Sequence, residues 1–302
     1  MTYQVPDQTG KLAIITGANS GTGKEAARKL AAAGANVIMA VRTASKGETA
    51  REEILAHHPG ANIEVRRIDL ADLTSVETFA HSVIGDGRPV DILLNNAGVM
   101  FPPVRHETAD GFELQMGSNY LGPFALTLRL LPVLLKARAP RVVTMSSGMA
   151  ARGTIDFEDL NWTKSYNPTA AYSRSKLADL LLSQQLARIA TAQGWNILSL
   201  GAHPGNAATG IADAGPRLGG SPSLLFRVAW KLTPQHSAEA GADPMLYAAT
   251  APDVVQGDYY GPRFNLVGRP AKADFTSKAK DQRVAERLWT ESERLTGVHA
   301  VA

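Results

Sequence analysis

Short apolar runs alternate with segments of helical periodicity over the first two hundred residues of this chain. Several of these runs are almost continuously apolar, which is typical of strands that are covered on both faces. The strands that we expect are 12–16, 37–41, 63–68, 92–95, 141–145 and 196–201. Helical patterns lie between them, and those at 23–33 and 170–193 are each followed by a glycine, which commonly ends a helix.

Strands that alternate with helices imply βαβ crossovers and therefore a parallel sheet. We expect an α/β protein with a Rossmann-type, doubly wound parallel sheet and helices on both faces, built as a single domain from residues 1–302. The stretch 203–235 contains five glycines and four prolines without a clear period, so we expect a substrate loop with a short apolar helix inside it. A final helix is expected at 278–295.

Composition narrows the class of protein further. The net charge of +3 arises from 31 basic and 28 acidic residues that are mixed along the chain, so no basic block predicts nucleic-acid binding. Cysteine is absent, which excludes disulfides, zinc–thiolate sites and thiol nucleophiles. No apolar stretch is long enough to span a membrane, and the first eleven residues leave no room for a secretory leader. We therefore expect a cytoplasmic protein without a bound metal.

A glycine-rich segment, 16–23, follows the first expected strand and opens the first expected helix. Glycines at such a place permit a tight turn and let backbone amides approach a pyrophosphate, while the helix N-terminus adds partial positive charge. The alternative is a glycine-rich turn without a ligand, but the position between strand and helix favours a dinucleotide site. The candidate cofactor-binding residues here are Gly17, Asn19, Ser20, Gly21, Thr22 and Gly23. Gly17 and Gly21 are expected in conformations that other residues rarely adopt.

The end of the second expected strand bears on the choice of nucleotide. Enzymes that use NAD commonly place an acidic residue there to bind the ribose diol, yet no Asp or Glu occurs between Asn36 and Gly47. Arg42 stands at this place instead, and its guanidinium suits a 2′-phosphate, with Lys46 close by in the sequence. We therefore expect a preference for NADP(H). The alternative is that Arg42 is an ordinary solvated arginine and that the protein uses NAD(H).

Tyr172 and Lys176 are four residues apart within a helical pattern, so both side chains lie on one face. A phenol ordinarily titrates near ~10, and a fixed positive charge beside it favours the phenolate and lowers its pKa toward neutrality. A pair with this spacing is common and by itself more often structural than catalytic.

Together, these motifs resemble those of the short-chain dehydrogenase/reductases. The shared features are Thr-Gly-x-x-x-Gly-x-Gly, Asn95-Asn96-Ala97-Gly98, Ser146-Ser147 and Tyr-x-x-x-Lys. The segment 155–162, His203-Pro204-Gly205 and Leu288-Trp289 resemble the retinol dehydrogenase and protochlorophyllide reductase-like branch. The absence of cysteine argues against the light-dependent reduction found in the second of these groups.

The resemblance implies a catalytic set of Asn119, Ser147, Tyr172 and Lys176. Tyr172 is then the general acid for carbonyl reduction or the base for alcohol oxidation, and Lys176 holds the nicotinamide ribose. Ser147 binds the reacting oxygen, with Ser146 as the alternative. Asn119 orders a water in an irregular helix; a purely structural asparagine is the alternative.

The resemblance also assigns further cofactor contacts. Asp69 and Leu70 contact the adenine, although Asp69 is alternatively a helix cap. The adenosine and ribose side is formed by Asn96, Ala97 and Gly98, whereas Asn95 is alternatively a sheet-stabilising residue. Pro204, Gly205 and Thr209 lie beside the carboxamide, and His203 is expected to be a structural neighbour rather than a base.

The substrate side is strongly apolar in sequence. The expected cavity lining is Val99, Met100, Phe101, Pro102 and Pro103, together with a lid of Ile211, Leu218, Leu224, Leu225, Phe226, Val228, Trp230 and Leu232. Such a lining favours a lipophilic carbonyl compound or alcohol, unless these residues pack on one another or on a second subunit. The run 224–232 is alternatively a peripheral membrane contact.

Two classes of function follow from these residues. The first is an NADP(H)-dependent carbonyl reductase or alcohol dehydrogenase, and the second is a non-catalytic cofactor sensor or scaffold on the same fold. A complete catalytic set favours the enzyme. The resemblance further implies pairing into a homodimer or homotetramer.

Overall fold

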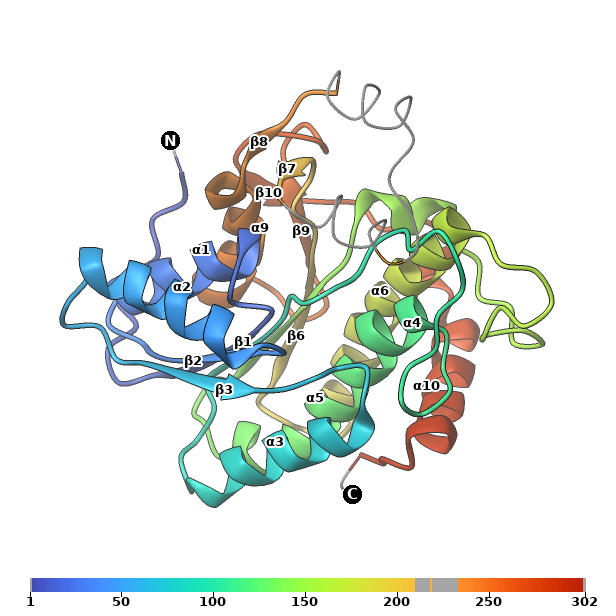
Figure 1. The fold of residues 1–302 in the computed structure, drawn as a ribbon, viewed down its shortest axis with the longest axis horizontal. Coiled ribbons are helices and arrows are strands. Elements are labelled where there is room, and N and C mark those ends of the chain that lie inside the picture. Colours follow the sequence, from blue (N-terminus) through green and yellow to red (C-terminus); the bar gives the residue numbers. More distant parts are fainter. Residues whose placement is uncertain (1, 210–217, 219–232, 301–302) are drawn as a thin grey trace.

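A single eight-stranded sheet lies at the centre of the molecule (Figure 1). The computed structural model describes residues 2–209, 218 and 233–300. The strands, in their order across the sheet, are β3 (Ile63–Arg67), β2 (Asn36–Val41), β1 (Leu12–Thr16), β4 (Ile92–Asn95), β5 (Arg141–Met145), β6 (Leu198–Ala202), β9 (Tyr259–Pro262) and β10 (Pro270–Lys272). All neighbours pair in parallel except β9 and β10, which form an antiparallel hairpin at one edge.

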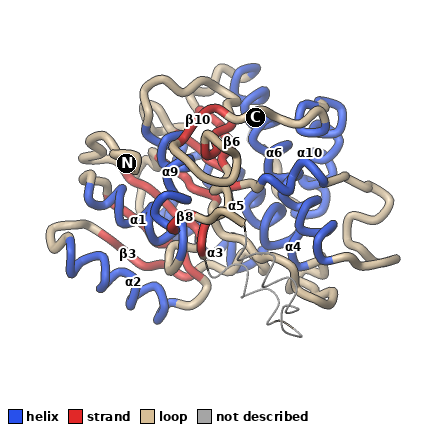
Figure 2. Tube along the Cα trace, turned by 90° about the horizontal axis from the view of Figure 1, so that it is seen from above, coloured by secondary structure: helices blue, strands red, loops and turns tan. Residues whose placement is uncertain are grey.

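Helices cover both faces of this sheet, as the doubly wound pattern predicts (Figure 2). One layer consists of α1 (Gly21–Ala32), α2 (Ala44–His57) and α9 (Ala238–Thr250). The other contains α3 (Leu73–Gly85), α4 (Leu114–Met116), α5 (Gly122–Leu134), α6 (Pro168–Ala192) and α10 (Gln282–Thr296). Each layer buries its own hydrophobic cluster against the sheet, so the strands are apolar on both faces. Short elements complete the chain: η1 (Gly117–Leu121), η2 (Gly148–Arg152), η3 (Lys278–Lys280) and the pair β7 (Ala207–Ala208) and β8 (His236–Ser237).

The six expected strands and the helices expected at 23–33, 170–193 and 278–295 are confirmed, with shifts at their ends that have local causes. The short apolar helix expected within 203–235 lies outside the described residues. Strand β6 begins two residues later than expected because the Asn196 side chain bonds the carbonyls of Ala137 and Arg138 and is drawn out of the strand. Helix α10 begins at Gln282 rather than at 278. The Asp281 carboxylate caps it there, and the preceding lysines form the separate turn η3.

The order of the strands creates a crevice at the carboxyl ends of β1 and β4. From β1 the chain proceeds to β2 and β3 on one side, and from β4 onward it builds the other side. Loops that leave β1 and β4 therefore diverge, and ligands of open α/β sheets bind where they part. Within the part of the chain that the structure describes, no helix combines the length and the apolar character needed to cross a membrane.

Candidate active site

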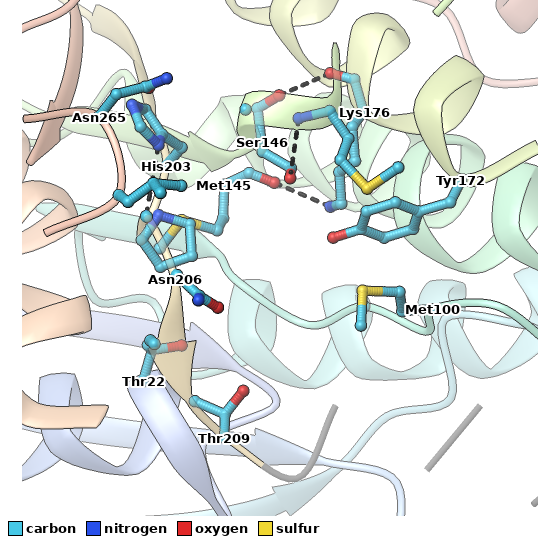
Figure 3. Close-up of a pocket in the computed structure, with 18 of the residues that line it drawn as sticks. Thr22, Met100, Met145, Ser146, Tyr172, Lys176, His203, Asn206, Thr209 and Asn265 are labelled. Carbon is cyan, nitrogen blue, oxygen red and sulfur yellow. Dashed lines mark hydrogen bonds between the residues drawn. The ribbon is translucent and has the colours of Figure 1, made fainter. Parts of the chain in front are cut away.

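Tyr172 and Lys176 lie one turn apart on α6, facing a cavity of about 340 Å³ (Figure 3). The helix begins because Asn167 caps it, its Oδ1 accepting from the amide of Ala170, and because Pro168 occupies the first turn. Both side chains are buried, and the Lys176 Nζ lies 5.9 Å from the centre of the Tyr172 ring. The spacing in the sequence therefore does bring the phenol and the amine together.

The environment of Tyr172 acts on its phenol in opposite directions. Burial raises the pKa of the Tyr172 hydroxyl, while the Lys176 ammonium and a hydrogen bond with Ser147 lower it. Burial is the largest of these effects and the pKa lies above its ordinary value. The expectation from the sequence, a net lowering by the lysine, is wrong for this environment because spacing on a helix does not report burial.

The two serines after β5 have different neighbours. Ser146 is fully buried, and its hydroxyl donates to the Lys176 carbonyl oxygen at 2.7 Å, so it ties β5 to α6. Ser147 lines the cavity, contacts the Tyr172 phenol, and its Oγ accepts from the amide of Met149 at 3.2 Å. Both serines line the cavity, and Ser147 is the one whose hydroxyl contacts the Tyr172 phenol.

Asn119 lies in η1, a π-helical turn between α4 and α5. Its side chain bonds both backbone groups of Val99, accepting from the amide at 2.8 Å and donating to the carbonyl at 3.0 Å. It also donates to the Ser175 hydroxyl at 2.9 Å. The expected irregularity of this helix is confirmed, and Asn119 joins it to α6 and to the loop after β4, behind the cavity rather than in its wall.

The glycine segment forms a close-packed turn at the start of α1. Gly17 and Gly21 have φ values of 68° and 56°, which confirms the expected backbone conformations. A Cβ on Gly23 would lie 2.5 Å from both the Gly17 carbonyl oxygen and the Asn96 side-chain nitrogen, so no side chain fits there. Asn96 holds this turn from β4, donating from Nδ2 to the Thr16 carbonyl and accepting at Oδ1 from the Thr22 hydroxyl.

A second cavity of about 270 Å³ lies at the ends of β1, β2 and β3. Eight of the predicted cofactor residues line it: Gly17, Asn19, Arg42, Lys46, Asp69, Leu70, Ala97 and Gly98. Gly98 also lines the first cavity, and an added Cβ there would lie 3.7 Å from the Lys176 Nζ. The two cavities therefore share a wall at Gly98 and together form an elongated site.

The remaining predicted cofactor residues fall into two groups. Thr22, Asn96, Pro204, Gly205 and Thr209 line the cavity that contains Tyr172 and Lys176. Ser20, Gly21 and Gly23 line neither cavity and shape the turn from behind. Ser20 precedes the first residue of α1, and its side chain makes no capping bond.

Arg42 and Lys46 are exposed at the end of β2 and the start of α2. Neither side chain has a hydrogen-bond or ion-pair partner within the described ranges, so both cations are available to an anion at the cavity wall. Asp69 closes the opposite wall. Its Oδ1 accepts from the Ala71 amide at 3.0 Å, whereas Asp72, not Asp69, caps α3.

The chain matches the family model of the short chain dehydrogenases over residues 11–215. It belongs to the short-chain dehydrogenase/reductase family. Retinol dehydrogenase 13 of Homo sapiens is 42% identical to it over 295 residues, which is 96% of this chain and 86% of that protein. Polyprenol dehydrogenase of Mus musculus is 40% identical over 97% of this chain and 86% of its own length. The expected family and its retinol dehydrogenase branch are confirmed, and the chain is an NAD(P)(H)-dependent oxidoreductase by family.

Solved structures agree with this assignment. The crystal structure of an uncharacterized protein from Mycobacterium paratuberculosis is 40% identical, covers all of both chains and has a TM-score of 0.83. Two more distant structures share the fold. An NADP-bound protein described as a gluconate 5-dehydrogenase from Beutenbergia cavernae is 24% identical, covers 84% of this chain and 96% of its own, and has a TM-score of 0.65. An NADH complex of a 3-ketoacyl-(acyl-carrier-protein) reductase from Brucella melitensis is 21% identical, covers 84% of this chain and 96% of its own, and has a TM-score of 0.62.

The elongated site fits a dinucleotide of the kind that this family uses. The cradle at Gly17 and Gly23 admits no Cβ, exposed cations stand at one end, and the Tyr172 phenol stands at the other. Backbone amides at the start of α1 suit a pyrophosphate. The glycine turn and the two cations thus fit the phosphate groups of such a cofactor.

The reacting end of the cavity has a mostly apolar wall opposite polar side chains. Figure 3 shows Met100 beneath the Tyr172 ring, with His203 and Asn206 across the cavity. Phe101 packs edge-on against Tyr172, with ring centres 5.1 Å apart. Burial lowers the pKa of His203 to about 4, so this imidazole is neutral at ordinary pH.

Sequence reasoning missed part of this wall. Asn265 and Leu266 lie in the β9–β10 hairpin, and Met149 and Arg152 lie in η2; all four line the cavity. The hairpin gives no periodic signal in the sequence, because its strands are only four and three residues long.

The predicted lid falls almost wholly outside the described residues. Ile211, Leu224, Leu225, Phe226, Val228, Trp230 and Leu232, and hence the suggested surface contact of 224–232, lie there. Leu218 is described and lines the second cavity rather than the cavity that contains Tyr172, where it was expected. Its carbonyl oxygen is bonded to the His106 ring at 2.7 Å.

Proposed function

We propose that this chain is an NADP(H)-dependent oxidoreductase that interconverts a lipophilic carbonyl compound and its alcohol, with Tyr172 as the general acid and base. The observation that supports this most directly is the buried Tyr172 phenol, which contacts Ser147 and faces a largely apolar cavity. A non-catalytic cofactor sensor needs only the nucleotide site. The Ser147 and Tyr172 hydroxyls beside Lys176, at the reacting end of the cavity, would have no use in such a protein.

A nicotinamide cofactor held between the two cavities, beside Tyr172 and Lys176, would supply or accept the hydride. Ser147 donates a hydrogen bond to the reacting oxygen and stabilises the charge that develops on it. Tyr172 gives its proton to that oxygen in reduction and removes the proton in oxidation. Lys176, fixed behind the phenol, stabilises the phenolate through its charge and offers an N–H to the ribose. Asn119 keeps the loop after β4 against α6 and so maintains this arrangement.

Arg42 and Lys46 support the preference for NADP(H). Both cations are exposed at the wall of the nucleotide cavity, and no acidic side chain follows β2 to bind a ribose diol. A guanidinium binds a phosphate through two parallel hydrogen bonds, whereas its interaction with a free ribose hydroxyl is weak. The 2′-phosphate is therefore the group that these residues distinguish.

The substrate is proposed to be a lipophilic primary or secondary alcohol, or the matching aldehyde or ketone. The relatives named for retinol and polyprenol are both named for apolar alcohols with one polar end. Met100 and Met149 line the apolar side of the cavity here, and Phe101 packs against the Tyr172 ring. Flexible methionine side chains adapt to irregular apolar shapes.

The test is a panel of carbonyl compounds followed through the absorbance of NADPH or NADH. Lipophilic aldehydes and ketones, retinal among them, are expected to be reduced with NADPH at higher kcat/KM than with NADH. Polar sugars serve as the matched negative class. Faster turnover of sugars, or equal use of NADH, would contradict the proposal. Nucleotide binding without turnover of any compound would favour the sensor.

A further inference from the structure

Asp179 is a buried carboxylate that the proposed function leaves unused. It lies on α6 three residues after Lys176, is 1% exposed, and its Oδ2 accepts from the Lys176 Nζ at 2.8 Å. Its other oxygen, Oδ1, is buried without a hydrogen-bond partner among the described residues. A buried carboxylate that is only half satisfied is costly, so a role in packing alone explains it poorly.

The carboxylate removes much of the freedom of Lys176. An ammonium has three N–H donors. One is given to the Met145 carbonyl at 2.9 Å and one to Asp179, which leaves a single donor for the side of the cavity (Figure 3 shows the bond to Met145). The amine is thus fixed between β5 and α6, and its positive charge beside Tyr172 is partly cancelled.

We propose that Asp179 is a positioning residue that holds Lys176 in place and offsets its charge beside Tyr172. The inference deepens the proposed function and rests on it where catalysis is concerned. This arrangement favours one direction of the reaction. Because Asp179 weakens the net positive charge beside Tyr172, the phenol stays protonated to higher pH. Tyr172 is then better suited to give a proton during carbonyl reduction than to remove one during alcohol oxidation.

Few charged or titratable groups face Asp179, so the direction of its effect on the pKa of Tyr172 is clear. On its own helix it faces Lys176 and Tyr172, and its charge raises the pKa of the Tyr172 phenol. From η1, Tyr120 also feels this charge, but burial keeps that phenol protonated and its hydroxyl is bonded to Ser292 of α10. Burial raises the pKa of the Asp179 carboxyl to about 7 against the opposing Lys176 ammonium, so the carboxylate is ionised at the higher pH where the Tyr172 phenol titrates.

A second buried acid–lysine pair offers a matched control. Asp243 on α9 is as buried as Asp179, and its Oδ1 lies 2.7 Å from the Nζ of Lys29. Its Oδ2 accepts from the Tyr3 amide, so both oxygens are satisfied. This pair lies between α1 and α9 and lines neither cavity. Asp243→Asn therefore removes an equivalent charge without reaching Tyr172.

The test measures the ionisation of Tyr172 in the enzyme without nucleotide, by NMR of isotope-labelled tyrosine. The chain has seven tyrosines, and Tyr172→Phe identifies the relevant signal. Asp179→Asn preserves the shape and an acceptor for Lys176 but removes the charge. The Tyr172 titration is expected to move down by about one pH unit. Asp243→Asn is expected to leave it in place.

An unchanged or upward titration in Asp179→Asn would overturn the inference, because the carboxyl would then be neutral or the lysine would lose its charge with it. Asp179→Ala repeats the measurement if the asparagine variant does not fold. This readout needs neither substrate nor turnover, so it stands even if the proposed function fails.

A kinetic arm tests the proposed direction. In Asp179→Asn the pH profile of alcohol oxidation is expected to move down by the same unit, which raises the oxidation rate about tenfold on its acidic limb. A titration shift without any change in the pH profile would show that Tyr172 is not the proton-transfer group, which counts against the proposed function rather than against the pairing.

Discussion

The reacting end of the cavity depends on a line of side chains from Ser147 through Tyr172 and Lys176 to Asp179. The sequence predicts the middle of this line, because a spacing of four on a helix places a phenol and an amine on one face. The sequence predicts the two ends of the line, Ser147 and Asp179, less well. Ser146 and Ser147 are distinguishable only when the neighbours of each hydroxyl are known, and Asp179 resembles any polar residue on a long helix until its burial is seen.

The different neighbours of the two serines lead to a paired prediction. Ser147→Ala is expected to lower kcat by about 10²-fold or more, since it removes the donor to the reacting oxygen. Ser146→Ala removes the bond to the Lys176 carbonyl and is expected to cost about 1 kcal/mol of unfolding free energy with a much smaller effect on kcat. Steady-state kinetics and thermal unfolding of both variants provide the check. A larger kinetic loss in Ser146→Ala would reverse the assignment.

The guanidinium of Arg42, which has no partner among the described residues, leads to a prediction about cofactor choice. Arg42→Gln is expected to raise the KM for NADPH by roughly 10- to 100-fold and to leave that for NADH nearly unchanged, because only the 2′-phosphate loses its partner. Arg51→Gln makes the same change of charge on α2, where Arg51 instead bonds Glu48 and the Ile63 carbonyl. A comparable loss in Arg51→Gln would mean that general charge, not a specific contact, attracts the nucleotide.

At the scale of elements, the central strands could be predicted from the sequence because both of their faces are buried. β1, β4 and β5 have the predicted bounds because each is a short apolar run between polar residues. The hairpin β9–β10 was missed. Its strands contain Gly261 and two prolines, which normally indicate turns, and they exist because β9 pairs with the distant strand β6. Long-range pairing of this kind leaves no periodic signal in the sequence.

The junction of β1, α1 and β4 leads to a prediction about packing. In Gly23→Ala the new methyl group would meet the Gly17 carbonyl and the Asn96 amide at 2.5 Å, so the turn must shift. We expect a loss of about 1–3 kcal/mol in unfolding free energy and weaker NADPH binding. Gly85→Ala, at the end of α3 with no atom within 4 Å, is the control and is expected to be neutral or stabilising by about 0.5 kcal/mol. Equal stability of the two variants would contradict this packing.

At the scale of the whole molecule, the sheet brings together loops that are far apart in the sequence. The ends of β1, β2 and β3 form the nucleotide cavity, and the ends of β4, β5 and β6 form the reacting end, with Gly98 between them. A doubly wound fold binds ligands beyond the carboxyl ends of its strands, and both groups of candidate residues lie there. The part played by the β9–β10 hairpin in the far wall was not predicted, because nothing local in the sequence connects Asn265 to α6.

The central claim is that the Tyr172 phenol transfers the proton. Its most direct test is turnover and NADPH binding in Tyr172→Phe, with Tyr166→Phe as the control, since Tyr166 is a partly buried phenol that bonds the Pro102 carbonyl outside the cavity. The account predicts that Tyr172→Phe loses at least about 10²-fold in kcat while its NADPH dissociation constant changes little, and that Tyr166→Phe retains most activity. Retention of turnover in Tyr172→Phe would contradict it.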